Sequence, residues 1–90
     1  VLVVVGNNGG WGAVAGGTKA LYPDGYAARA ETIPATAFTT SPDFAAIAAS
    51  SRAAALSVSR AEDLPGVLEE AVSLIHTRRQ SVLVDVQLAR

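Results

Sequence analysis

The sequence predicts an α/β fold in which a parallel sheet is flanked by helices. Two observations carry this prediction: β-branched runs occupy residues 1–5 and 82–88, and a long amphipathic stretch covers residues 61–78. A continuous apolar run that ends at a turn signal is typical of a strand buried on both faces, and such strands belong to parallel sheets covered by helices. Strand and helix patterns alternate along the chain, as they do in α/β domains.

The first strand is expected over residues 1–5, because Gly6 ends the apolar run. A glycine-rich loop follows over residues 6–12, and a weak helix is expected over residues 13–21, where two adjacent glycines interrupt it. Residues 22–40 carry proline, glycine and threonine without an apolar period, which predicts an extended loop. Loops of this length in a compact domain are usually functional or disordered.

A helix start is encoded by the tripeptide Ser-Pro-Asp at residues 41–43. Serine can cap the free amides, proline suits the first helical position, and aspartate favours the positive end of the helix dipole. The short helix that follows is expected to place Phe44, Ile47 and Ala48 on one face.

The second half of the chain contains a strand, a helix and a strand. Leu56 and Val58 alternate with serines, which predicts a short strand. The helix is expected near residues 61–78, and its basic last turn suits the negative end of the helix dipole. Residues 82–88 form the closing strand. The apolar stripe of the helix is expected to contain Leu64, Val67, Leu68, Ala71, Val72 and Ile75.

The composition excludes several classes of protein. Half of the residues are apolar (50%) and the formal net charge is -1, so nothing favours nucleic acid or anionic lipid as a partner. The absence of cysteine excludes a disulfide framework and a thiolate metal site. No stretch approaches the roughly 20 apolar residues that cross a bilayer, so no membrane partner is expected. The chain starts on an apolar strand without an initiator methionine, which suggests a piece of a longer protein.

The loop over residues 6–12 carries the most distinctive chemistry. In an open α/β sheet, ligands bind outside the carboxyl ends of the strands, where this loop begins. Its four glycines let the backbone approach a ligand closely, and its amides and the following helix can face an anion. The amide oxygens of Asn7 and Asn8 suit a hard cation such as Mg²⁺. The loop is expected to combine an anion cradle with oxygen ligands for a metal.

Two other interpretations of the loop stay open. Asparagine and glycine dominate tight turns for conformational reasons alone. Residues 10–15 also match the dinucleotide-binding fingerprint that ends in alanine, which should open a helix leading to a second strand. The expected helix break at Gly16 and Gly17, and the lack of an apolar strand over residues 26–38, argue against a dinucleotide.

Residues 3–12, Val-Val-Val-Gly-Asn-Asn-Gly-Gly-Trp-Gly, resemble the second half of the thiamine diphosphate-binding motif. The form is that of acetolactate synthases and their benzoylformate decarboxylase-like relatives. Three further segments resemble elements of the family. Residues 42–48 resemble its "PDFxxLA" helix, residues 63–71 its "EEL…ALEEAL" helix, and residues 82–86 its "VLIDV" strand. The resemblance implies that residues 1–90 form the C-terminal portion of a thiamine diphosphate-binding domain, with a partial flavodoxin-like fold.

The resemblance also implies roles for the loop residues. The side chain of Asn8 and the main-chain carbonyl of Gly10 would ligate Mg²⁺, while Asn7, Gly9 and Trp11 would complete the contacts to the cofactor. The family's third protein ligand is the aspartate of an upstream Gly-Asp-Gly motif, which this chain lacks. Because two neutral oxygens make a poor magnesium site, we expect a cofactor anchor that is inactive on its own.

The function implied by the resemblance is that of an enzyme segment. The whole enzyme would depend on thiamine diphosphate and Mg²⁺ and would decarboxylate or ligate 2-oxo acids, with the carbanion chemistry supplied by the cofactor. Expected partners are the remaining domains of the enzyme, further copies in a homo-oligomer and a 2-oxo acid, in the cytoplasm. The alternative is a non-catalytic α/β module that associates through the edge of its first strand.

The other polar and aromatic residues favour structural roles. His76 is the single histidine and lies in the last turn of a helix, where it is expected to cap the helix or face solvent. Asp85 lies within a β-branched strand, where it is expected to point outward or to be hydrogen-bonded rather than to be catalytic. Glu69 and Glu70 indicate a solvated helix face. Trp11 is expected either to pack in a core or to form a wall of the substrate pocket.

Overall fold

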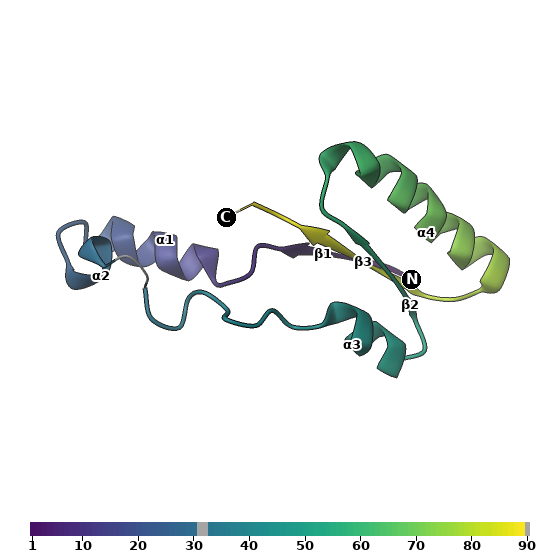
Figure 1. Cartoon of the computed structure of the whole chain (residues 1–90), viewed down its shortest axis with the longest axis horizontal. Coiled ribbons are helices and arrows are strands. Elements are labelled where there is room, and N and C mark those ends of the chain that lie inside the picture. Colours follow the sequence, from purple (N-terminus) through teal and green to yellow (C-terminus); the bar gives the residue numbers. More distant parts are fainter. Residues whose placement is uncertain (31–32, 90) are drawn as a thin grey trace. The chain divides into compact units, whose positions relative to one another are not determined.

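The computed structural model describes residues 1–30 and 33–89 of the chain (Figure 1). The chain divides into two compact units. The sheet unit comprises Val1–Asn7 and Pro42–Leu88, and the loop unit is built from Asn8–Ser41.

The sheet unit contains three parallel strands in the order β1-β3-β2. β1 spans Leu2–Asn7, β2 spans Ala54–Val58 and β3 spans Val82–Gln87. β3 is the central strand and hydrogen-bonds to both of its neighbours. The strand patterns and the parallel α/β fold expected from the sequence are confirmed.

Helices cover both faces of this sheet, with α3 on one side and α4 on the other (Figure 1). α3 spans Phe44–Ser50, and α4 spans Leu64–Arg78 after a short 3₁₀ turn, η1, at Ala61–Asp63. In the sheet order β1-β3-β2, the connection from β1 to β2 crosses over β3 to the far edge of the sheet. The connection from β2 to β3 then runs across the sheet in the opposite direction. Because crossovers between parallel strands are right-handed, opposite directions place their helices on opposite faces. No helix in the described part of the chain is both long and apolar enough to cross a membrane.

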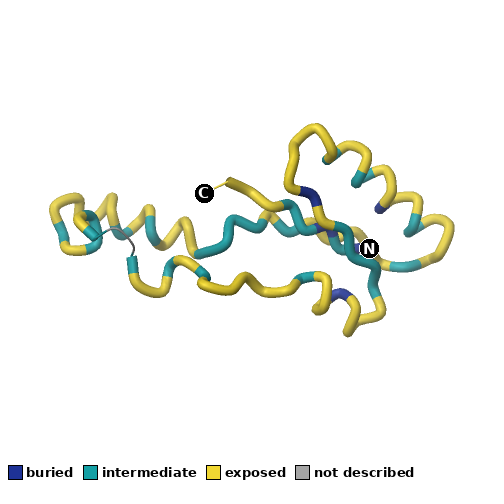
Figure 2. Tube along the Cα trace, viewed as in Figure 1, coloured by how far each residue is buried: buried dark blue, intermediate teal, exposed yellow. Residues whose placement is uncertain are grey.

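The core forms where α4 covers the sheet (Figure 2). Val82 and Val84 of β3 are 1% and 0% exposed, and Val58 and Ala71 pack against them. Because successive side chains of a strand point to opposite faces, the two β3 valines share the α4 face. Partly buried apolar side chains surround this cluster: Ala54, Leu56, Leu64, Val67, Leu74, Ile75 and Val86.

α4 follows the expected apolar stripe with one exception. The predicted residues are buried or half-buried apart from Val72, which is 44% exposed. Leu74 packs against the core in its place. The stripe centres on the fully buried Ala71; Leu74 lies almost one turn further along the helix on the same side, whereas Val72 is rotated by about 100°.

α3 begins later than the tripeptide at residues 41–43 suggested. Asp43 is the cap, because its carboxylate accepts a hydrogen bond from the amide of Ala46 at 2.9 Å. Aspartate and serine are equally good caps, and here the aspartate directly precedes the helix. Ala48 is buried and Phe44 is half-buried as expected, but Ile47 is 53% exposed.

The two-sided burial predicted for the first strand is wrong for this chain. β1 pairs with β3 along one edge only, and Leu2, Val3 and Val4 are 37%, 46% and 52% exposed. α3 and α4 pack mainly over β2 and β3, so neither helix covers β1 fully. A continuous apolar run predicts the strand correctly but does not say how much of this chain covers it.

The loop unit contains two helices, α1 at Gly12–Leu21 and α2 at Tyr26–Arg29. α1 runs without interruption through Gly16 and Gly17, so the predicted helix break is wrong. A glycine inside a helix costs about 1 kcal/mol relative to alanine, which weakens a helix without ending it.

Most of residues 22–40 is irregular, as predicted. The segment also contains α2, and its residue Ala37 forms an isolated antiparallel bridge with Gly10. Glu31 and Thr32 fall outside the described residues, as does Arg90 at the end of the expected domain. Apart from that bridge, the described part of residues 26–38 contains no strand. This argument against the dinucleotide fingerprint therefore holds, although the helix break did not.

We expect Val84→Ala to lower the free energy of unfolding by about 2 kcal/mol, because it removes two methyl groups from a closed core position. Val72→Ala is the matched control, since it makes the same change at a position that is 44% exposed and should cost less than about 0.5 kcal/mol. Urea unfolding monitored by circular dichroism measures both. Equal losses would contradict the assignment of the core.

Candidate functional site

The carboxyl ends of the three strands meet at one edge of the sheet. Because the strands are parallel, Asn7, Val58 and Gln87 end β1, β2 and β3 on the same side. Ligands of open α/β sheets bind outside this edge. Asn7 belongs to the sheet unit, whereas Asn8 and the residues after it belong to the loop unit.

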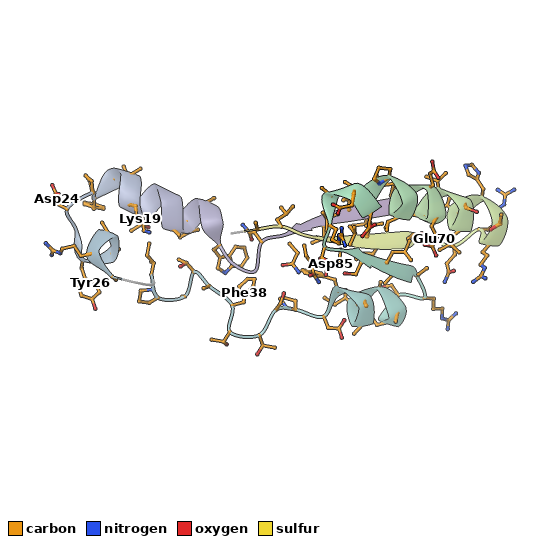
Figure 3. All side chains as sticks on the ribbon, turned by 45° about the horizontal axis from the view of Figure 1, so that its top comes forward. Lys19, Asp24, Tyr26, Phe38, Glu70 and Asp85 are labelled. Atoms are coloured by element: carbon orange, nitrogen blue, oxygen red, sulfur yellow. The ribbon has the colours of Figure 1, made fainter. Side chains whose placement is uncertain are left out.

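Asn7 is held by β3 through its backbone and its side chain. Its carbonyl accepts a hydrogen bond from the amide of Leu88 at 2.8 Å, and its Nδ2 lies 3.5 Å from Oδ2 of Asp85. Figure 3 labels Asp85 among the side chains of the sheet unit. The other oxygen of that carboxylate, Oδ1, is buried and accepts no hydrogen bond from the described residues. Asp85 is thus hydrogen-bonded through one oxygen, which is one of the two expected alternatives, while its other oxygen has no donor among the described residues.

In the loop unit, the side chain of Asn8 closes a tight turn. Its Oδ1 accepts a hydrogen bond from the amide of Gly10 at 3.3 Å, which is the pattern of an Asx turn. Gly9 lies between them with φ 71°, a left-handed conformation that glycine adopts at no steric cost. The tight-turn interpretation therefore describes the local conformation correctly.

Residues 36–38, called the clamp below, hold this turn through two backbone hydrogen bonds. The amide of Trp11 donates to the carbonyl of Thr36 at 2.7 Å, and the amide of Phe38 donates to the carbonyl of Gly9 at 2.9 Å. These two bonds form the antiparallel bridge between Gly10 and Ala37. No sequence pattern predicted this clamp, because one bridge requires only a short extended segment.

The clamp explains why position 10 is glycine. A methyl group built on Gly10 would overlap the carbonyl oxygen of Thr36, a backbone atom that cannot move aside independently. A methyl group on Gly12 would lie 2.9 Å from Nδ2 of Asn8, which is closer than real contacts allow. Gly16 and Gly17 have open space instead, so the loop glycines and the helix glycines serve different purposes.

The clamp also determines which backbone groups face outward. The amides of Gly10 and Trp11 are engaged, so the expected anion cradle cannot use them in this conformation. In this type of bridge the bonds run through the flanking residues, and the polar groups of Gly10 itself point away from residues 36–38. Its carbonyl accepts no hydrogen bond within the described part of the chain.

The beginning of α1 offers a second set of outward-facing groups. The cap position, Trp11, supplies no side-chain hydrogen bond, and the first intrahelical bond runs from Ala15 to the carbonyl of Trp11. The amides of Gly12, Ala13 and Val14 therefore have no acceptor among the described residues. Such a helix terminus attracts anions through its amides and its dipole.

Trp11 is not a core residue. It is 58% exposed, and its ring meets that of Phe38 edge to face, with centroids 5.6 Å apart and an interplanar angle of 84°. This geometry is favourable for aromatic pairs and fastens the loop to the clamp. Of the two expected roles, core packing is therefore wrong, and a place in a pocket wall stays a prediction.

The acidic residues that the structure describes and the single histidine do not form a metal centre. His76, Glu69 and Glu70 are exposed on α4, as expected. No group of three or more histidine, cysteine, aspartate or glutamate side chains within residues 1–30 and 33–89 is placed to hold a metal ion. Any metal at the loop would need neutral oxygens such as those of Asn8 and Gly10, which are of the type that Mg²⁺ accepts.

Comparison with known proteins identifies the family. Residues 1–86 match the family model described as "Thiamine pyrophosphate enzyme, C-terminal TPP binding domain". No curated protein and no solved structure matches the chain. Thiamine pyrophosphate is another name for thiamine diphosphate, so the match agrees with the motif at residues 3–12 and with the parallel α/β sheet. The chain belongs to the family of C-terminal TPP binding domains of thiamine pyrophosphate enzymes.

Proposed function

We propose that this chain supplies one half of the metal–diphosphate site in an acetolactate synthase-like enzyme that decarboxylates or ligates 2-oxo acids. The observation that carries the proposal is the outward carbonyl of Gly10, which accepts no hydrogen bond from the described residues and lies in the turn closed by Asn8. Membership of the family supports thiamine diphosphate as the cofactor, and the neutral oxygens of the loop support Mg²⁺ as the metal.

In this proposal the metal ligands from the chain are Oδ1 of Asn8 and the carbonyl of Gly10. The clamp at residues 36–38 and the Asx turn hold both before any metal arrives, which lowers the entropic cost of binding. The amides at the start of α1, which have no acceptor among the described residues, would face the diphosphate, whose negative charge the helix dipole favours. Asn7, Gly9 and Trp11 would border the cofactor. Once bound, thiamine diphosphate supplies the stabilisation of a carbanion.

The same chemistry explains why we propose only half a site. Mg²⁺ prefers six oxygens and is usually held by one or two carboxylates together with phosphates. The described part of this chain brings no acidic cluster to the loop. We therefore propose that the remaining domains of the enzyme supply the carboxylate and the group that activates the aminopyrimidine ring of the cofactor. We also propose that the enzyme is cytoplasmic and homo-oligomeric, and that this chain alone is inactive.

One observation favours the alternative of a non-catalytic module. Leu2, Val3 and Val4 of β1 are 37–52% exposed, and β1 has a partner along only one edge in the described structure. Such an edge can pair with another strand. An interaction module would use this edge and would have no need of the outward groups of the loop.

Titration calorimetry with thiamine diphosphate and Mg²⁺ separates the two functions. The enzyme proposal predicts that the complete protein binds the cofactor only when Mg²⁺ is present, because the diphosphate and the metal share ligands. An interaction module predicts no binding of the cofactor with or without the metal.

Asn8→Ala in the complete protein should weaken Mg²⁺-dependent cofactor binding by at least about tenfold, a loss typical even of groups that only support metal ligands. Titration calorimetry and the Mg²⁺ dependence of activity both measure the effect. Thr39→Ala, which removes an exposed polar group from the same unit, should leave both unchanged. An unaltered Mg²⁺ dependence in Asn8→Ala would refute the ligand assignment.

Gly10→Ala should weaken cofactor binding by about tenfold or more, because the added methyl group overlaps the Thr36 carbonyl and displaces the turn. Gly16→Ala makes the same change where the new atom meets nothing within 4 Å. This control should retain the wild-type affinity and gain up to about 1 kcal/mol of stability, since alanine is the better helix former. Equal affinities for the two variants would show that the clamp is not needed.

A further inference from the structure

Asp85 is an unusual residue for the middle of a sheet. It lies on β3, between Val5 of β1 and Ser57 of β2, on the face opposite to the buried valines. Its Oδ1 is buried without a hydrogen-bond partner among the described residues, and its Oδ2 lies 3.5 Å from Nδ2 of Asn7. A buried acceptor without a donor destabilises a fold, so a carboxylate at this place calls for a role other than stability.

The contact with Asn7 has a definite chemical direction. A carboxylate only accepts hydrogen bonds, whereas the amide of asparagine has a donor end and an acceptor end. Asp85 therefore selects the NH₂ end of Asn7, and the amide oxygen of Asn7 faces the other way. The backbone of Asn7 is fixed independently, since its carbonyl accepts from the amide of Leu88 at 2.8 Å and its partner in the sheet is Gln87.

We infer that Asp85 is a positioning residue that sets the orientation of the Asn7 side chain at the entrance to the cofactor loop. The inference rests on the proposed function, in which Asn7 borders the diphosphate anchor. The distance of 3.5 Å is at the long end for a hydrogen bond. Asp85 acts through Asn7 and touches no cofactor itself.

A double-mutant cycle on the complete protein tests this inference. Asp85→Leu and Asn7→Ala should each weaken Mg²⁺-dependent binding of thiamine diphosphate by about tenfold, measured by titration calorimetry. The double variant should be no weaker than Asn7→Ala alone, because Asp85 has nothing left to orient. Additive losses would overturn the inference.

Two further measurements distinguish positioning from structural support and from charge. Asp85→Leu should keep or raise the urea midpoint, because it removes a buried oxygen that lacks a donor; a lowered midpoint would make the role structural. Asp85→Asn keeps an acceptor oxygen at the same place and should bind within about threefold of the wild type. A loss as large as that of Asp85→Leu would mean that the negative charge acts directly, contrary to the inference.

The Asn8→Ala variant separates failure of this inference from failure of the proposed function. If wild-type binding requires Mg²⁺ and Asn8→Ala loses it, while Asp85→Leu binds normally, the inference alone is wrong. If the wild type does not bind thiamine diphosphate at all, the proposed function is wrong, and the inference falls with it.

Discussion

The position of β3 between β1 and β2 is the constraint on which the rest of this structure depends. Its backbone is hydrogen-bonded on both edges, and α4 packs against its buried valines. The opposite face carries Asp85, and the end of the strand fixes Asn7 through Leu88. A single strand therefore joins the sheet, contributes half of the core and holds the first residue of the candidate site.

The loop after β1 shows how a short turn presents polar groups without charged side chains. Glycines at positions 9 and 10 allow a left-handed residue and a close backbone approach, and the side chain of Asn8 closes the turn. The bridge at residues 36–38 then uses some of the backbone polar groups and leaves the Gly10 carbonyl without a donor among the described residues. In the proposed function, these neutral oxygens and helix-terminal amides would bind the metal and the diphosphate together.

The sequence predicts the strands and α4 well, because long β-branched runs and helical spacing are local signals. It also predicts where the candidate site lies, since strand ends in parallel sheets share an edge. The exposure of β1 was not predicted, because burial depends on neighbouring elements that a local sequence pattern does not reveal. The same reason explains two contacts that were not predicted: the bridge between Gly10 and Ala37, and the contact between Asn7 and Asp85, which lie 78 positions apart. The continuity of α1 through Gly16 shows that a modest propensity cost can be outweighed.

The parallel pairing of β1 with β3 has a consequence for the order of events during synthesis. Eighty positions separate Val1 from Ser81, where the two strands begin to meet, so β1 leaves the ribosome long before its partner exists. At translation rates of about 5 to 20 residues per second, this interval lasts roughly 4 to 16 s. β2 must wait as well, because β3 is its neighbour in the described sheet. Both strands are therefore made seconds before their pairing with β3 can form, and chaperones shield apolar segments that are exposed for such intervals.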